Sequence, residues 1–216
     1  VEDYSDTVIS GDCDGLCQIQ TTWTSTDFCD NVSSCNQIIT KDVTPLVEEA
    51  LKTDVDGDGK EDDLILGTTQ TTLTLTAADA ACIVQWMPAS GTTPTALKRE
   101  NAVVGVGCTP GTNPKDPSGK IVNPLFGAVL KLELYARLDS SFGDTPLADL
   151  GCDIPPIVMQ TIRRENAQNP QVKHLLRVAN LALGNLVLVP HLQELLEVLE
   201  CICDPIDLCD AEDLTN

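Results

Sequence analysis

The residues whose types and spacing could do chemistry lie in one run, Asp-Val-Asp-Gly-Asp-Gly-Lys-Glu-Asp-Asp, at positions 54–63. Asp54, Asp56 and Asp58 alternate along this run, and Asp62 follows shortly after them. Carboxylates this close together repel one another unless a cation lies among them. Closely spaced ligands that are all oxygen suit a hard divalent ion, so the run predicts a calcium site. The alternative is an acidic turn that is exposed to solvent and holds no ion.

This run resembles the Asp-x-Asp-x-Asp-Gly calcium loops of EF-hands, dockerins, thrombospondin type 3 repeats and FG-GAP or VCBS propeller blades. In such loops a glycine at the position of Gly59 makes the tight turn. The resemblance implies side-chain ligands from Asp54, Asp56, Asp58 and Asp62, a backbone carbonyl ligand from Lys60, and a further carboxylate, Asp63, beside the ion or in place of Asp62.

One position departs from the EF-hand pattern. An EF-hand loop ends on a bidentate glutamate at its twelfth position, where this chain has Ile65. The Leu-Ile stretch that follows the aspartates, and Gly67 after it, are closest to the FG-GAP kind of loop. That resemblance implies a loop that leads straight into a strand.

The elements that must position the loop are short. A helix is expected over 45–52, with Thr44 as its N-cap and Pro45 as its first residue. Strands are expected at 64–66, 71–76 and 102–106, and a helix over 77–87.

The second half of the chain has helical periodicity, with one ambiguous stretch. Helices are expected over 156–164, 172–183 and 192–199. The apolar residues of 125–138 fit either period, and their alternation favours a long strand or a bent segment. The expected fold class is α+β, with a small sheet that carries the calcium loop packed against several amphipathic helices.

Three regions are expected along the chain. Residues 1–42 form a Cys-rich extended segment with strand-like runs at 7–9 and 19–24, residues 43–150 an α+β core with the calcium loop, and residues 151–216 a helical C-terminal region. We expect 43–216 to be one globular unit.

The chain has ten cysteines, an even number with irregular spacing. Zinc sites usually show Cys-x-x-Cys pairs or added histidines, whereas His174 and His191 fit helix surfaces or caps. Disulfides are therefore favoured over zinc. The expected disulfide cysteines are Cys13, Cys17, Cys29, Cys35, Cys82, Cys108, Cys152, Cys201, Cys203 and Cys209. Cys201 and Cys203 are too close to bond each other and should have separate partners.

The charge of the chain excludes some partners. It has 33 acidic and 13 basic residues and a formal net charge of -20. Such a surface repels nucleic acids and anionic lipid heads, and no apolar run has the length of a membrane span. The first residue, Val1, fits the removal of a secretory signal, and the edge of a fragment would look the same.

A second resemblance covers residues 77–200. Its runs are Ala-Asp-Ala-Ala-Cys-Ile-Val-Gln-Trp-Met-Pro, Asn-Pro-Leu-Phe-Gly-Ala-Val-Leu-Lys-Leu-Glu-Leu-Tyr-Ala-Arg-Leu-Asp and Leu-Leu-Arg-Val-Ala-Asn-Leu-Ala-Leu-Gly. It resembles an uncharacterised module of large secreted bacterial surface proteins. That implies an extracellular structural setting and no catalytic residues.

The functional hypothesis is a secreted, calcium-binding structural protein, not an enzyme, because no nucleophile elbow, phosphate loop or dinucleotide motif occurs. We expect it to be an extracellular or cell-surface subunit of a fibre, surface layer or adhesive assembly, which associates with itself through its N-terminal segment. The alternatives are a calcium-dependent carbohydrate- or protein-binding module and a secreted hydrolase.

Overall fold

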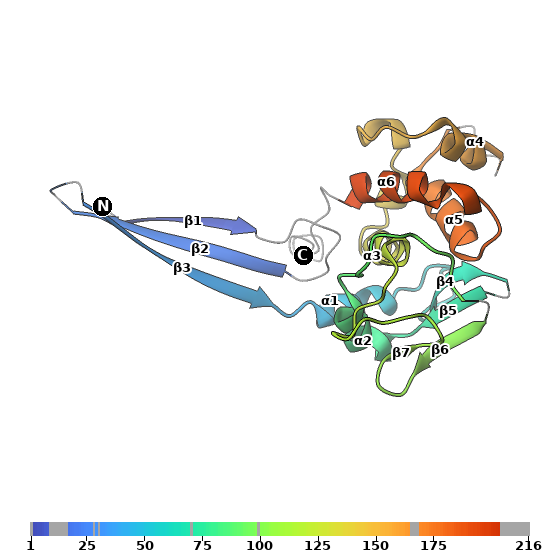
Figure 1. The fold of residues 1–216 in the computed structure, drawn as a ribbon, viewed down its shortest axis with the longest axis horizontal. Coiled ribbons are helices and arrows are strands. Elements are labelled where there is room, and N and C mark those ends of the chain that lie inside the picture. Colours follow the sequence, from blue (N-terminus) through green and yellow to red (C-terminus); the bar gives the residue numbers. More distant parts are fainter. Residues whose placement is uncertain are drawn as a thin grey trace.

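The computed structural model describes residues 2–8, 17–27, 29, 31–69, 71–98, 100–164 and 169–203. These residues form a mixed α and β structure with two separate sheets and six α-helices, so the expected α+β class is confirmed (Figure 1). None of these helices combines the length and the apolar composition needed to cross a bilayer.

The first sheet is an arm that projects from the rest of the molecule (Figure 1). It has three antiparallel strands, β1 (Glu2–Val8), β2 (Cys17–Thr26) and β3 (Val32–Lys41), with β2 in the middle. In its register Tyr4 pairs with Trp23, and Trp23 pairs with Cys35. The strand-like runs at 7–9 and 19–24 fall at β1 and β2, with Ile9 outside the described residues, while β3 was not expected.

The remaining described residues, 43–203, form the body of the molecule. Residues 43–203 contain a large set of buried apolar side chains, and they are aliphatic for the most part. One contiguous core joins the second sheet to the helices that follow it. The body therefore holds the buried apolar surface that stabilises the fold.

The second sheet has the strand order β4-β5-β6-β7. Its strands are β4 (Leu64–Thr68), β5 (Thr71–Leu75), β6 (Asn101–Gly105) and β7 (Thr109–Pro110). β4 and β5 form an antiparallel hairpin, and β5 pairs in parallel with β6 through a crossover. That crossover contains the short 3-10 helix η1 (Ala77–Asp79) and α2 (Ala80–Trp86). This agrees with the helix that the sequence predicts over 77–87.

The helix α1 (Thr44–Leu51) connects the arm to the second sheet and agrees with the expected helix over 45–52. Its first turn differs from the prediction in one detail. Thr44 is the first residue of the helix and not its N-cap, and its amide donates to the Asp42 carboxylate at 2.9 Å. Asp42 therefore satisfies an amide that the helix leaves unpaired.

The expectation of a strand at 125–138 was wrong. These residues form α3 (Pro124–Leu138), the longest helix, and its N-terminal ten residues are almost all buried. A helix that is apolar on every side loses the one-sided periodicity that identifies amphipathic helices. The alternation of leucines in 130–138 therefore reflects burial on all sides and not a strand.

Three further α-helices complete the body, α4 (Pro156–Arg164), α5 (Val172–Leu183) and α6 (Leu192–Cys203), as the periodicity predicted. Gly184 and Asn185 end α5 as expected. Short 3-10 helices lie between them and before them, at η2 (Phe142–Asp144), η3 (Leu147–Asp149) and η4 (Val189–His191). Both α5 and α6 pack on α3, which is the centre of the body.

Candidate metal centre

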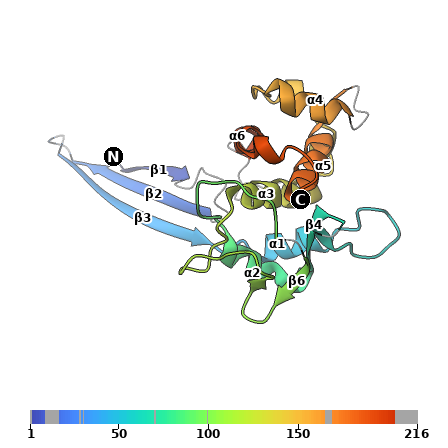
Figure 2. The ribbon, with the colours of Figure 1, turned by 45° about the vertical axis from the view of Figure 1, so that its right-hand side comes forward.

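The aspartate loop connects α1 to β4 on the surface of the body. Figure 2 shows it on the side of the body opposite the arm. Its two ends are joined at the base, where the Asp62 amide donates to the Thr53 carbonyl at 3.1 Å. β4 begins at Leu64, directly after the aspartates, so the expectation that the loop leads into a strand is confirmed.

Asp54, Asp56 and Asp58 lie together as the sequence predicts. One carboxylate oxygen from each can be chosen so that all three lie within 4.8 Å of one another. Oxygens that bind one calcium ion at about 2.4 Å lie at most about 5 Å apart, so the spacing suits a single ion. All three side chains are exposed. This cluster could hold a metal ion.

Backbone amides hold these carboxylates in place. The Asp54 carboxylate accepts hydrogen bonds from the amides of Gly57 and Gly59, both at 2.7 Å, and from the amide of Asp58 at 3.2 Å. The next two aspartates each accept one amide two residues ahead, at 3.0 and 2.9 Å. The loop thus wraps its backbone around the first aspartate and orients the others.

The two glycines make this wrapping possible. Gly57 and Gly59 have φ angles of +79° and +87°, a region that side chains disfavour. An added Cβ would meet no atom within 4 Å at either position. The need for glycine is therefore conformational and not steric.

The other residues of the expected ligand set have separate positions. Asp62 is half-buried, and its Oδ2 atom accepts the amides of Val55 and Asp56 at 2.8 and 3.1 Å. The Lys60 ammonium group lies 3.3 Å from Asp58 Oδ2. Asp63 is exposed at the start of β4. Asp62 therefore orients the start of the loop with one oxygen.

Arg137, in the last turn of α3, is a residue of the site that the sequence analysis did not identify. Its guanidinium group donates to the carbonyl of Asp62 at 2.7 Å and to that of Asp63 at 3.0 Å. The Thr53 hydroxyl donates back to the Arg137 carbonyl at 3.4 Å. Arg137 thereby ties both ends of the loop to the core helix.

One turn earlier on α3, Glu133 extends this network into the sheet. The Asn180 side chain of α5 donates to Glu133 Oε1 at 2.6 Å and accepts the Gly67 amide of β4 at 2.9 Å. The network therefore joins α3, α5 and β4 directly behind the loop. We call Glu133, Arg137 and Asn180 the bracket.

The charges of the bracket are perturbed by burial. Burial raises the pKa of the Glu133 carboxyl, while the hydrogen bond from Asn180 and the charge of Arg137 act in the opposite direction. Burial lowers the pKa of the Arg137 guanidinium, and the nearby carboxylates of Glu133, Asp62 and Asp63 oppose that shift. The partial burial makes both groups sensitive to the loss of their partners.

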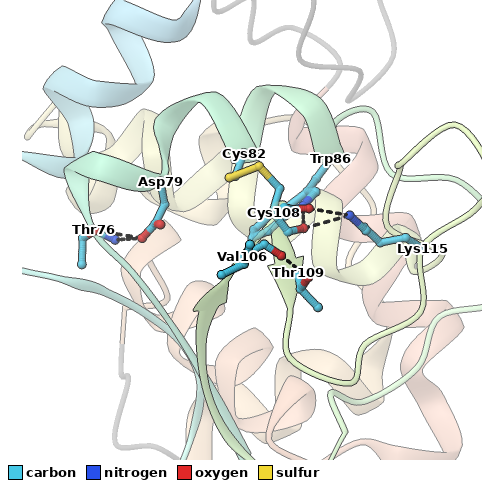
Figure 3. Close-up of a disulfide and its surroundings, with 9 residues drawn as sticks. Thr76, Asp79, Cys82, Trp86, Val106, Cys108, Thr109 and Lys115 are labelled. Carbon is cyan, nitrogen blue, oxygen red and sulfur yellow. Dashed lines mark hydrogen bonds between the residues drawn. A yellow bond between two sulfur atoms is a disulfide. The ribbon is translucent and has the colours of Figure 1, made fainter.

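Two disulfides stabilise the body, and they confirm the disulfide prediction for four cysteines. Cys82 bonds to Cys108, and Cys152 bonds to Cys201. Figure 3 shows the first of these next to Trp86, whose indole N–H donates to the Cys108 carbonyl at 2.9 Å. This disulfide therefore attaches α2 to the segment between β6 and β7.

The remaining cysteines differ. Cys29 and Cys35 lie exposed on the arm and form no disulfide within the described part of the chain. Cys203 is buried near the Ala128 carbonyl. Cys13, Cys209 and the side chain of Cys17 lie outside the described residues, so their predicted disulfides stay predictions.

Both histidines have the structural positions that the sequence predicted. His174 Nδ1 accepts the Gln171 amide at 3.1 Å and so caps α5, and His191 Nδ1 lies 3.0 Å from Glu194 Oε1 at the start of α6. Neither belongs to the aspartate cluster. The candidate centre among the described residues is therefore the oxygen-lined loop.

Comparison with known proteins adds no relative: no protein-family model, no curated protein and no solved structure matches this chain.

Proposed function

We propose that this protein is a secreted, calcium-binding structural protein that forms a subunit of an extracellular assembly. The observation that carries the proposal is the position of the aspartate cluster. It lies at the junction of α1 and β4, where it is tied to the core helix by Arg137. An ion bound there would stabilise a junction between elements, which is a structural role.

Calcium is the ion that suits the ligands best. The cluster offers carboxylate oxygens on an exposed loop, and calcium accepts such ligands in varied geometry, whereas magnesium demands a small octahedral cage. Asp54, Asp56 and Asp58 would supply the side-chain oxygens, and the Lys60 carbonyl and Asp62 are candidates to complete the shell. The strong negative charge of the chain raises the local concentration of divalent cations.

The disulfides support an extracellular setting. Bonds such as Cys82–Cys108 and Cys152–Cys201 persist in oxidising compartments and are rare in the reducing cytosol. A surface that carries a net charge of -20 also keeps an extracellular subunit soluble until it assembles.

The arm supports self-association. A three-stranded sheet that projects from the body leaves the outer edges of β1 and β3 without a neighbouring strand among the described residues. Unpaired strand edges are templates for pairing with another chain. We propose that subunits associate through this N-terminal segment.

Calorimetry tests the calcium site. At a calcium concentration a hundred times the Kd, binding adds about 2.7 kcal/mol to the free energy of unfolding, which raises the Tm of a domain of this size by about 5 to 10 °C. The double variant D54N/D58N should lose this increase, and D153N, an exposed aspartate of another loop, should keep it. Equal Tm values for the wild type in calcium and in chelator would exclude the site.

Electron microscopy tests the assembly. We expect the full chain with calcium to form ordered polymers, and a variant without residues 1–42 to remain monomeric. That variant should keep the helical circular dichroism signal of the wild type, because the six described α-helices lie outside the deleted residues. Assembly that is unaffected by the deletion would contradict a role for the arm.

A further inference from the structure

The two edges of the arm differ in charge. β1 carries three carboxylates, Glu2, Asp3 and Asp6, whereas β3 has no charged residue from Val32 to Thr40. Two copies of a chain with a net charge of -20 repel one another, and most strongly where their acidic edges meet. Charged side chains are also a common means of blocking an exposed strand edge. β3 is therefore the edge that a second copy can approach.

The exposed part of β3 has a thiol at its middle. Residues 32–37 are all exposed, with Val32 at 67% of its full exposure, and Cys35 lies among them without a disulfide. In an oxidising compartment an exposed thiol can form a disulfide with a second cysteine that reaches it.

The described positions of the arm offer Cys35 no partner in its own chain. Cys29 lies in the hairpin turn beyond the Thr26–Val32 pair, three residues further along the strand, at least about 10 Å from Cys35 by the strand rise. Cys17 pairs with Lys41, six residues away in the other direction, at about 20 Å. A disulfide joins Cα atoms at most about 7 Å apart, so both distances are too long.

We propose that β3 pairs antiparallel with β3 of a second copy across a two-fold axis at Cys35, and that the two Cys35 thiols form a disulfide across that axis. This inference rests on the proposed self-association and identifies its contact. The symmetry places Ser34 opposite Asn36 and Val32 opposite Ile38, so the paired residues 32–38 carry no charge. Residues opposite each other in an antiparallel pair have Cα atoms about 4.5 to 5.5 Å apart, a spacing that a disulfide accepts.

The chemistry is a thiol–disulfide exchange. The two Cys35 thiols together lose two protons and two electrons and form one S–S bond. A low-molecular-weight disulfide accepts the two protons and the two electrons, its S–S bond breaks, and it is released as two thiols.

Non-reducing electrophoresis of the full chain incubated with oxidised glutathione tests the bond. C29S is the matched control, because Cys29 is the other exposed cysteine in the described part of the arm. The wild type and C29S should both give a covalent dimer that a reductant converts to monomer. C35S should lose at least nine-tenths of it, and mass spectrometry of the dimer should find a Cys35–Cys35 peptide. A C35S dimer equal to that of the wild type, or a wild type without a covalent dimer, would overturn the inference.

A pair of double variants tests the register. S34E/N36E places glutamate opposite glutamate on both sides of the axis, whereas S34E/N36K places glutamate opposite lysine. We expect cross-linking of the first to be at least ten times slower than that of the second, and equal rates would reject the pairing. Electron microscopy of the wild type separates the two proposals, because wild-type polymers without the Cys35–Cys35 dimer refute the Cys35 contact and leave the structural function standing.

Discussion

Replacing Arg137 with methionine should destabilise the body by loosening the base of the aspartate loop. Methionine keeps an unbranched aliphatic stem of similar reach, so the packing of α3 changes little. The substitution removes two hydrogen bonds from a charged donor, at 2.7 Å to the Asp62 carbonyl and at 3.0 Å to the Asp63 carbonyl. It also leaves Glu133 without the opposing charge one turn away.

The size of the effect follows from these contacts. A hydrogen bond to a charged group contributes about 1.5 to 3 kcal/mol. Arg137 is half-buried and Asp63 is exposed, so water replaces part of the loss. We therefore take about 1 kcal/mol for each of the two hydrogen bonds, which is below the lower limit of that range. The expected loss in the free energy of unfolding is then about 2 kcal/mol. For a domain of this size that corresponds to a decrease in Tm of about 4 to 8 °C.

Urea unfolding followed by tryptophan fluorescence measures this loss, because Trp86 is fully buried in the body and reports its unfolding. R164M is the matched control, since Arg164 is exposed in the last turn of α4. R137M should also weaken calcium binding measured by calorimetry, whereas R164M should not. Equal unfolding free energies for R137M and R164M would refute the role of the bracket.

Three further predictions use other parts of the structure. Burial raises the pKa of Glu133 in the folded protein above its ordinary value of 4.5, so the folded state binds the proton more tightly than the unfolded state. The free energy of unfolding therefore falls as the pH rises from about 4.5 through the higher pKa of the folded state. E133Q should flatten the profile of urea-derived stability against pH from about pH 4 upward, and an unchanged slope would contradict this. The Cys152–Cys201 disulfide closes 49 residues and Cys82–Cys108 closes 26, so C152S/C201S should lose about 4 kcal/mol and C82S/C108S about 3.5 kcal/mol, with denaturant midpoints as the measurement. G59A should weaken calcium binding several-fold because of the φ angle of +87°, whereas K60A should change it little, and calorimetric titration compares the two.

Much of the fold could be predicted from the sequence because its signals are local. Turn residues and the change from a period of two to a helical period delimited α1, β4, β5 and the three C-terminal helices. The aspartate spacing likewise predicted which carboxylates lie together, since a short loop between glycines brings alternate side chains to one centre. The three aspartates of the cluster are all within five residues of one another.

Arg137 could not be found in this way, because its role depends on contacts between distant parts of the chain. It contacts residues 74 and 75 positions earlier, and those contacts exist only when 124–138 is a helix. The expectation of a strand there also separated Glu133 from Arg137, which are neighbours at i and i+4 on a helix and not on a strand. The error in secondary structure therefore concealed the bracket. β3 was missed for a different reason, since its polar residues Ser33, Ser34 and Asn36 show no apolar alternation.

The positions of the loop and the arm indicate that the proposed calcium site and the proposed self-association involve different parts of the molecule. The loop lies on the side of the body opposite the arm (Figure 2), and its bracket leads into α3, α5 and β4. An ion bound in the loop would therefore stabilise the body and would not bridge the β3 edges. It follows that a chelator should lower the Tm of the body while a covalent arm dimer, once formed, remains linked. Dissociation of that dimer by a chelator alone, without a reductant, would show that the metal and the arm share one interface.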